Sequence, residues 1–177
     1  GLHKVRLSAF KMLVLGIFAG IYIGFAGIAS TTASATIENP SVARLLSACV
    51  FPAGMAMVLI AGSELFTGNN MVMAFGAFDK SVSWGDAGKV WLVSYLGNFV
   101  GCAILALLFA GAGASGTADY FAGFINNKLT IPMGQMFMRA VLCNFFVCLG
   151  VLCGIKLKSE TGKFLMIVMC ISAFVFS

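Results

Sequence analysis

Residues 62–70 read GSELFTGNN and interrupt an apolar segment that runs from 45 to 61 and resumes from 71 to 78. Two interpretations of this interruption are open. In one, 62–70 is a surface loop and 71–78 is a short interfacial helix. In the other, the interruption is a break inside a membrane-embedded helix, where irregular backbone is tolerated only against protein or a water-filled cavity.

The basic residues at the two ends of this segment favour the break. Arg44 precedes the segment and Lys80 follows it, about 36 residues later, whereas one straight span needs about 20 residues. A helix with a loop folded into it fits this length. We therefore predict a discontinuous helix whose second half starts near Thr67. The unpaired N–H groups and the dipole at such a start suit an anion.

The composition places the chain in a membrane. Of its 177 residues, 60% are hydrophobic and 10% are charged, and the mean hydropathy is +1.02, whereas soluble domains carry about 25% charged residues. We expect an all-α integral membrane protein that forms a single transmembrane domain over 1–177. Its apolar segments are 12–34, 43–78 with the interruption at 62–70, 88–112, 131–155 and 164–177.

Two stretches of the second half need separate comment. Segment 164–177 is too short to span a bilayer, so we expect the chain to stop within a fifth span. Residues 113–130 are more polar than the other connections. We expect them to form an exposed connection.

Lysine and arginine are distributed unevenly between the two ends of the predicted spans. With a cytoplasmic N-terminus, eight of the 11 fall on inner flanks, as the positive-inside rule requires. We predict a multi-pass protein of the cell (cytoplasmic) membrane, with membrane lipid around it and no nucleic-acid partner. The inner residues are Lys4, Arg6, Lys11, Lys80, Lys89, Lys156, Lys158 and Lys163, and the outer ones are Arg44, Lys128 and Arg139.

Small residues and thiols within the spans indicate packing. Glycines at four-residue spacing let helix backbones approach closely in lipid, which predicts a compact bundle. The six cysteines lie in apolar runs without a C-x-x-C pair, and His3 is the one histidine of the chain. We therefore expect reduced thiols, no metal, no cofactor and no enzymatic site. The glycines concerned are Gly16, Gly20, Gly24, Gly97, Gly101, Gly150 and Gly154.

A few polar side chains lie in or beside apolar segments. Glu64 would repel an anion if it faced a pore, so we interpret it as tied to the loop or to another polar group. Arg139 is costly in a membrane without a partner, and Glu64 is one candidate. Asn144 is either a hydrogen-bond donor to another helix or a pore-facing donor. Lys128 is either a solvated loop lysine or a cation that concentrates anions at a pore mouth.

A neutral-solute pore, of the water or ammonia type, is the alternative function. Residues 39–41 read NPS and resemble the Asn-Pro-Ala signature of water channels. No second copy occurs among the three prolines of the chain, and spans without histidine also disfavour this alternative. We interpret 39–41 as a turn and helix start, with Ser41 as the N-cap.

Residues 62–69, GSELFTGN, resemble the signature loop of the formate/nitrite transporter family, also called formate–nitrite–hydrosulfide channels. Two further stretches agree, 96–98 (LGN) and 139–148 (RAVLCNFFVC). The resemblance covers essentially the whole chain in order. The overall likeness leans slightly to the hydrosulfide branch.

This resemblance implies a homopentamer of separate pores, each an aquaporin-like inverted-repeat helical bundle with interrupted second and fifth helices. The substrate pathway would contain Thr67 at the pore centre, Asn144 in a central chamber and Lys128 at the outer vestibule. The family carries a central histidine just beyond the break of the fifth helix, where this chain stops at Ser177. Constrictions are expected at Phe51, Met55, Leu65, Phe66 and Phe174, and loop or polar support from Glu64, Gly68, Asn69, Asn98 and Arg139.

The expected activity is passage of small monovalent anions, namely hydrosulfide, formate or nitrite. An anion in a dry apolar slit carries a large desolvation penalty. Protonation of the substrate during passage would lower this penalty. An enzyme or electron-transfer subunit would need ligands or a catalytic dyad inside the spans, and the sequence offers none.

Overall fold

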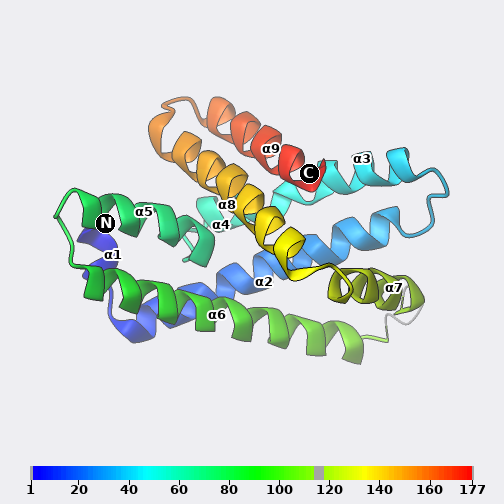
Figure 1. Cartoon of the computed structure of the whole chain (residues 1–177), viewed down its shortest axis with the longest axis horizontal. Helices are drawn as coiled ribbons and strands as arrows, with labels where there is room; N and C mark the ends of the chain where they lie inside the picture. Colours follow the sequence, from blue (N-terminus) through cyan, green and yellow to red (C-terminus); the bar gives the residue numbers. More distant parts are fainter. Residues whose placement is uncertain (1, 114–117, 177) are drawn as a thin grey trace.

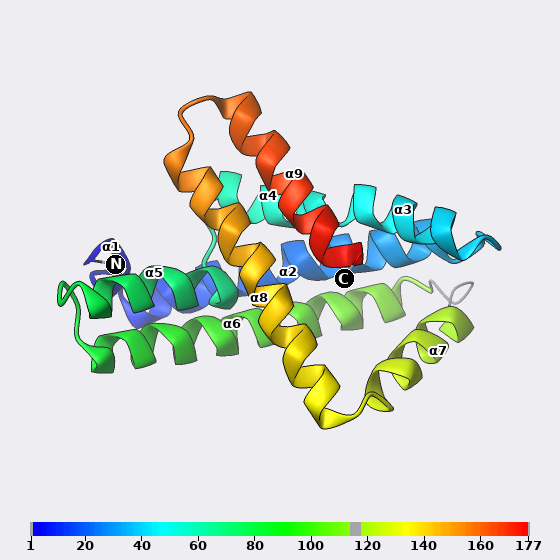
Figure 2. The same cartoon turned by 45° about the horizontal axis from the view of Figure 1, so that its top comes forward.

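The computed structural model describes residues 2–113 and 118–176, and over these residues the chain is helical without strands (Figure 1). Long helices α2 and α6 lie side by side, and the α8–α9 hairpin crosses them (Figures 1 and 2). The elements are α1 (Leu2–Val5), α2 (Ala9–Ser34), α3 (Pro40–Val50), α4 (Pro52–Ile60), α5 (Phe66–Phe78), α6 (Trp84–Gly111), α7 (Ala118–Leu129), α8 (Met133–Lys156) and α9 (Glu160–Phe176).

Four helical stretches within the described ranges are long and apolar enough to cross a membrane. They make the chain a multi-pass membrane protein. Helix α9 is shorter and packs against α8, α3 and α4. Ser177, where the expected break of the fifth helix would begin, lies outside the described residues. The four stretches are Ala9–Ser34, Pro40–Ile60, Trp84–Gly111 and Met133–Lys156.

Glycines bring α2 and α6 into backbone contact, as their spacing predicts. A Cβ added to Gly97 would lie 2.8 Å from the Leu13 carbonyl oxygen, and one on Gly20 or Gly101 would overlap the backbone of the facing helix. Such contacts are open only to residues without a side chain. The two helices therefore pack backbone against backbone.

A proline bends the helix that precedes the interruption. Pro52 has no N–H to give to the carbonyl of Ala48, so α3 ends at Val50 and α4 begins at Pro52, with Phe51 between them. The Ser172 hydroxyl of α9 donates to the freed Ala48 oxygen at 2.8 Å. A polar group released by the bend is thus satisfied by a neighbouring helix.

One local prediction needs correction, and another is confirmed with an addition. The side chain of Asn39, and not that of Ser41, caps α3, because its Oδ1 accepts from the N–H groups of Ser41 and Val42. Pro40 then occupies the first helical turn, where its missing N–H costs nothing. The connection at 113–130 is exposed over residues 119–130 apart from Phe121, but it contains the helix α7, which composition alone did not indicate.

Candidate functional site

The interruption is shorter than the sequence suggested. Helix α4 ends at Ile60 and α5 begins at Phe66, so Phe66–Asn70 are helical. Gly62 has a φ of +68°, a left-handed conformation that glycine adopts without penalty. The Ser63 N–H donates to the Val58 oxygen at 2.9 Å, which closes α4 with a Schellman motif. Gly62 and Ser63 of the motif therefore end helix α4.

Asn98, halfway along α6, joins the interruption to the α2–α6 pair. Its Oδ1 accepts from the Phe66 N–H at 2.9 Å, and its Nδ2 donates to the carbonyl oxygens of Glu64 and Gly16, both at 2.9 Å. The Glu64 N–H donates to the Leu15 oxygen at 3.3 Å. The backbone between α4 and α5 is thus held against the middle of α6, at Asn98, and the first third of α2, at Leu15 and Gly16.

The Glu64 carboxylate pairs with Lys4, not with Arg139. Lys4 Nζ donates to Glu64 Oε2, and Glu64 is 5% exposed. Arg139 is exposed and makes no ion pair within the described part of the chain. The expected candidate pairing of Glu64 with Arg139 was therefore wrong. No local pattern indicates Lys4 as the partner, because 60 residues separate it from Glu64.

Thr67 lies in the first turn of α5, where helix N–H groups lack intrahelical partners. Its Oγ1 is buried without a hydrogen-bond partner, and no partner within the described residues is recorded for the N–H groups of Thr67 and Gly68. Its carbonyl oxygen accepts from the Cys148 thiol at 3.6 Å. Cys148 was not among the residues for which a site role was predicted. The start of α5 is therefore a cluster of unused donors beside α8.

Gly68 and Asn69 complete this first turn. A Cβ on Gly68 would lie 3.3 Å from Val151 Cγ2, so a glycine here lets α5 lie close to α8. The Trp91 indole N–H donates to the Asn69 carbonyl oxygen at 3.3 Å, while Asn69 Nδ2 is buried without a partner. Gly68 thus lets α5 lie close to α8, and Asn69 connects α5 to α6, while their role in supporting the loop stays a prediction.

Most of the expected constriction residues gather in one apolar cluster. Met55 is 1% exposed and packs with Val147, Val151, Ile167 and Ile171 of α8 and α9. The rings of Phe51 and Phe174 are 6.0 Å apart, and both lie against this cluster together with Leu65. Phe66 lies outside this cluster and packs on Tyr95 of α6, with the two ring centroids 5.3 Å apart.

Asn144 and Lys128 make no hydrogen bond to the start of α5 within the described residues. Asn144 Nδ2 donates to the Ala140 oxygen of its own helix at 3.5 Å. It precedes Cys148 by four residues, so both lie on one face of α8 about 6 Å apart along the axis. Lys128 Nζ is 5.1 Å from the Phe124 ring centroid at the exposed end of α7. Asn144 therefore shares a helix face with Cys148, which contacts Thr67. Lys128 packs on Phe124 of its own helix instead.

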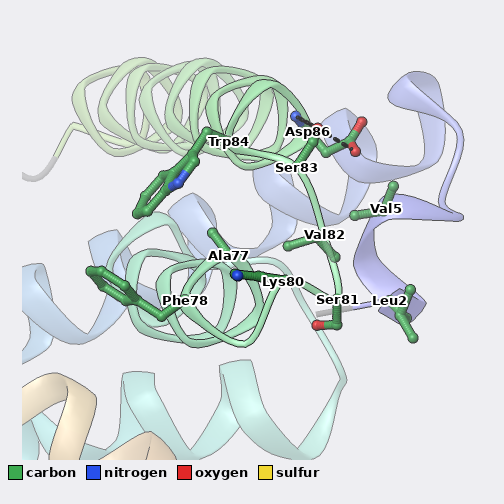
Figure 3. A pocket seen from close by; sticks show the side chains of 10 residues that line it. All are labelled: Leu2, Val5, Ala77, Phe78, Lys80, Ser81, Val82, Ser83, Trp84 and Asp86. Carbon is green, nitrogen blue, oxygen red and sulfur yellow. Dashed lines mark hydrogen bonds between the residues drawn. The ribbon is translucent and has the colours of Figure 1, made fainter.

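A separate open hollow lies at the far end of α5, about 15 Å from Thr67 along the helix axis. It is lined mainly by α1, the end of α5 and the α5–α6 turn. Figure 3 shows the Phe78 and Trp84 rings together on one flank and Asp86 on the other, with Asp86 bound to Ser83. Because its groups are remote from the unpaired donors, we place the candidate site at the start of α5.

The six cysteines are free. Within 2–113 and 118–176, no group of three or more His, Cys, Asp and Glu side chains is arranged to hold a metal ion. The candidate site is thus made of backbone N–H groups, one hydroxyl and apolar walls.

Comparisons with known proteins identify the family. The family model described as "Formate/nitrite transporter" matches residues 1–177. The nitrite transporter NirC of Salmonella typhimurium is 34% identical over 179 residues, which cover 97% of this chain and 65% of NirC. The chain spans about two thirds of the length of this and several other curated relatives.

Solved structures agree in fold. An FNT family ion channel superposes with a TM-score of 0.92 at 33% identity, over 98% of this chain and 71% of that one. A pentameric formate channel with formate bound gives a TM-score of 0.81 at 27% identity, over 94% of this chain and 68% of that one. The chain therefore belongs to the formate/nitrite transporter family, whose members are transporters and channels and not enzymes.

Proposed function

We propose that this chain forms the pore of a channel or transporter for small monovalent anions, with formate, nitrite and hydrosulfide as candidate substrates. The observation that carries this proposal is the start of α5, where Thr67 Oγ1 is buried without a partner beside the unpaired N–H groups of Thr67 and Gly68. A buried donor without a partner is costly in a protein. A bound anion or water removes that cost.

The charge at this point favours an anion over a neutral solute. The start of α5 carries the positive end of the helix dipole, equivalent to roughly half an elementary charge. Glu64 is the nearest acid in the sequence, and its carboxylate is engaged by Lys4. The negative charge of Glu64 is therefore compensated, and the dipole of α5 acts without opposition.

The pathway follows from the same residues. Lys128 attracts anions at the outer vestibule, and Asn144 receives them on the α8 face that also carries Cys148. Thr67 binds them at the centre, between apolar constrictions formed by Phe51, Phe174 and their neighbours. Phe66, which precedes Thr67 and packs on Tyr95, adds a further apolar side chain beside the centre. Because the walls are apolar, transfer of a proton to the substrate during passage lowers the desolvation penalty.

The relatives support the substrate class and the assembly. One is named as a nitrite transporter, and one solved neighbour is a pentameric formate channel with formate bound. We extend both properties to this chain as a homopentamer in the cell membrane. The N-terminus is cytoplasmic, because the inner flanks then hold eight of the 11 basic residues.

Flux into proteoliposomes that contain the complete gene product tests this proposal. Formate, nitrite and hydrosulfide are compared at two external pH values, with protein-free liposomes as the control. Saturating uptake of one anion, larger at the lower pH, would support proton-assisted anion transport and identify the substrate. A folded protein that conducts none of the three anions but does conduct water or ammonia would refute it.

A further inference from the structure

The side-chain amide of Asn98 hydrogen-bonds to three backbone groups, which belong to α2, to the α4–α5 interruption and to the start of α5. It accepts from the N–H of Phe66 and donates to the oxygens of Glu64 and Gly16, each at 2.9 Å. Both hydrogens of Nδ2 are thereby engaged. One side chain of α6 thus holds α2, the interruption and the first residue of α5.

Close packing of α2 and α6 lets Asn98 reach these groups. A Cβ on Gly16 would lie 3.2 Å from Gly97 Cα and 3.5 Å from Asn98 Nδ2. A side chain at Gly20 would overlap the Asn98 backbone. The glycines therefore bring the α6 backbone close enough for Asn98 to bind a carbonyl of α2 and the loop together.

Helix α5 has no N-cap side chain of its own. Its N-cap residue is Leu65, whose side chain makes no capping hydrogen bond and has no polar atom with which to make one. Asn98 provides the missing acceptor from a different helix, at the N–H of Phe66. This bond and the bond to the Glu64 oxygen remove one donor and one acceptor from the site. The N–H groups of Thr67 and Gly68 remain unpaired.

We propose that Asn98 is a positioning residue that determines which groups the start of α5 presents to an anion. This inference rests on the proposed function. With Asn98 in place, the carbonyl oxygen of Glu64 is bound and the remaining groups are donors. Without it, that oxygen is released beside the site, where it repels anions, and the first turn of α5 loses its cap and its orientation.

The test compares Asn98→Ala with Ser94→Ala in anion flux into proteoliposomes. Ser94 is a matched control, because it lies one turn earlier on α6, is 0% exposed and donates only to Val90 and Trp91 of its own helix. We expect N98A to raise the half-saturating anion concentration at least tenfold, and S94A to change it less than twofold. A purely structural role would instead lower the amount of folded protein at an unchanged half-saturating concentration, and would overturn the proposal.

Two further measurements keep the inference separate from the proposed function. Asn98→Asp keeps the shape of the side chain and the acceptor for the Phe66 N–H, but it has no donors for the oxygens of Glu64 and Gly16. We therefore expect its half-saturating anion concentration to be raised as in N98A. A wild-type value in N98D would overturn the proposal. Hydrogen exchange should show Phe66 N–H protected in the wild type and at least tenfold less protected in N98A, and equal protection would also overturn it. A wild-type protein that transports none of the anions would refute the proposed function instead, whatever the exchange result.

Discussion

Removing the partner of a buried carboxylate should destabilise the bundle strongly. Glu64 is 5% exposed, and its Oε2 is paired with Lys4, whose side chain is 22% exposed. Breaking a buried ion pair costs about 3–5 kcal/mol, and the partial exposure of Lys4 places the expected loss near the lower end of this range. We expect Lys4→Met to lower the free energy of unfolding by about 3 kcal/mol.

Paired variants make this prediction specific. Lys4→Met combined with Glu64→Gln removes both charges, so we expect it to recover more than half of the loss. Lys11→Met is the control for an exposed lysine that has no acid partner among residues 2–113 and 118–176. Arg139→Met tests the alternative partner, and we expect both controls to stay within about 0.5 kcal/mol of the wild type.

Equilibrium unfolding of the detergent-solubilised protein measures these differences. A fluorescence signal from the two tryptophans can follow the transition. A Lys4→Met variant as stable as the wild type would refute the reasoning, and so would an Arg139→Met variant that loses as much stability as Lys4→Met. A double variant less stable than Lys4→Met would show that the neutral pair packs worse than a single buried charge.

Three other changes give distinct outcomes. Thr67→Val removes a buried hydroxyl without a protein partner, so anion flux should fall at least tenfold while thermal stability holds or rises; unchanged flux would contradict the role of Thr67. Ser172→Ala leaves the Ala48 oxygen freed by Pro52 without its donor and should cost about 1–3 kcal/mol in denaturant unfolding, whereas equal stability would mean that water replaces the bond. Gly62→Ala must adopt a φ of +68° and should cost about 1 kcal/mol, with no loss expected if the turn can rearrange.

Much of the architecture could be predicted from local sequence because membrane helices are coded by length and hydropathy. The composition and the apolar segments predicted an all-α membrane protein, and the described residues are helical with four stretches able to span. Motif 62–69 predicted the family, which the family model confirms. The exposed helix α7 was not predicted, since its polar residues resemble a loop in composition.

The candidate site was predictable only in part. Thr67 was expected at the centre, and its unpaired hydroxyl agrees with that role, which stays a proposal. Of the expected constriction residues, Phe66 is separate from the cluster around Met55. No periodicity in the sequence distinguishes these positions, because an all-apolar helix has no polar face to mark its orientation.

The sequence by itself determined the membrane environment, the apolar helices, the approximate position of the interruption and the family, since each depends on residues close together in the chain. The tertiary structure alone decided the partners of the interruption: Lys4 for Glu64, Asn98 for Phe66 and Ser172 for Ala48. These pairs are separated by 60, 32 and 124 residues. Buried polar groups must find a partner, but only the packing of the helices determines which one is within reach.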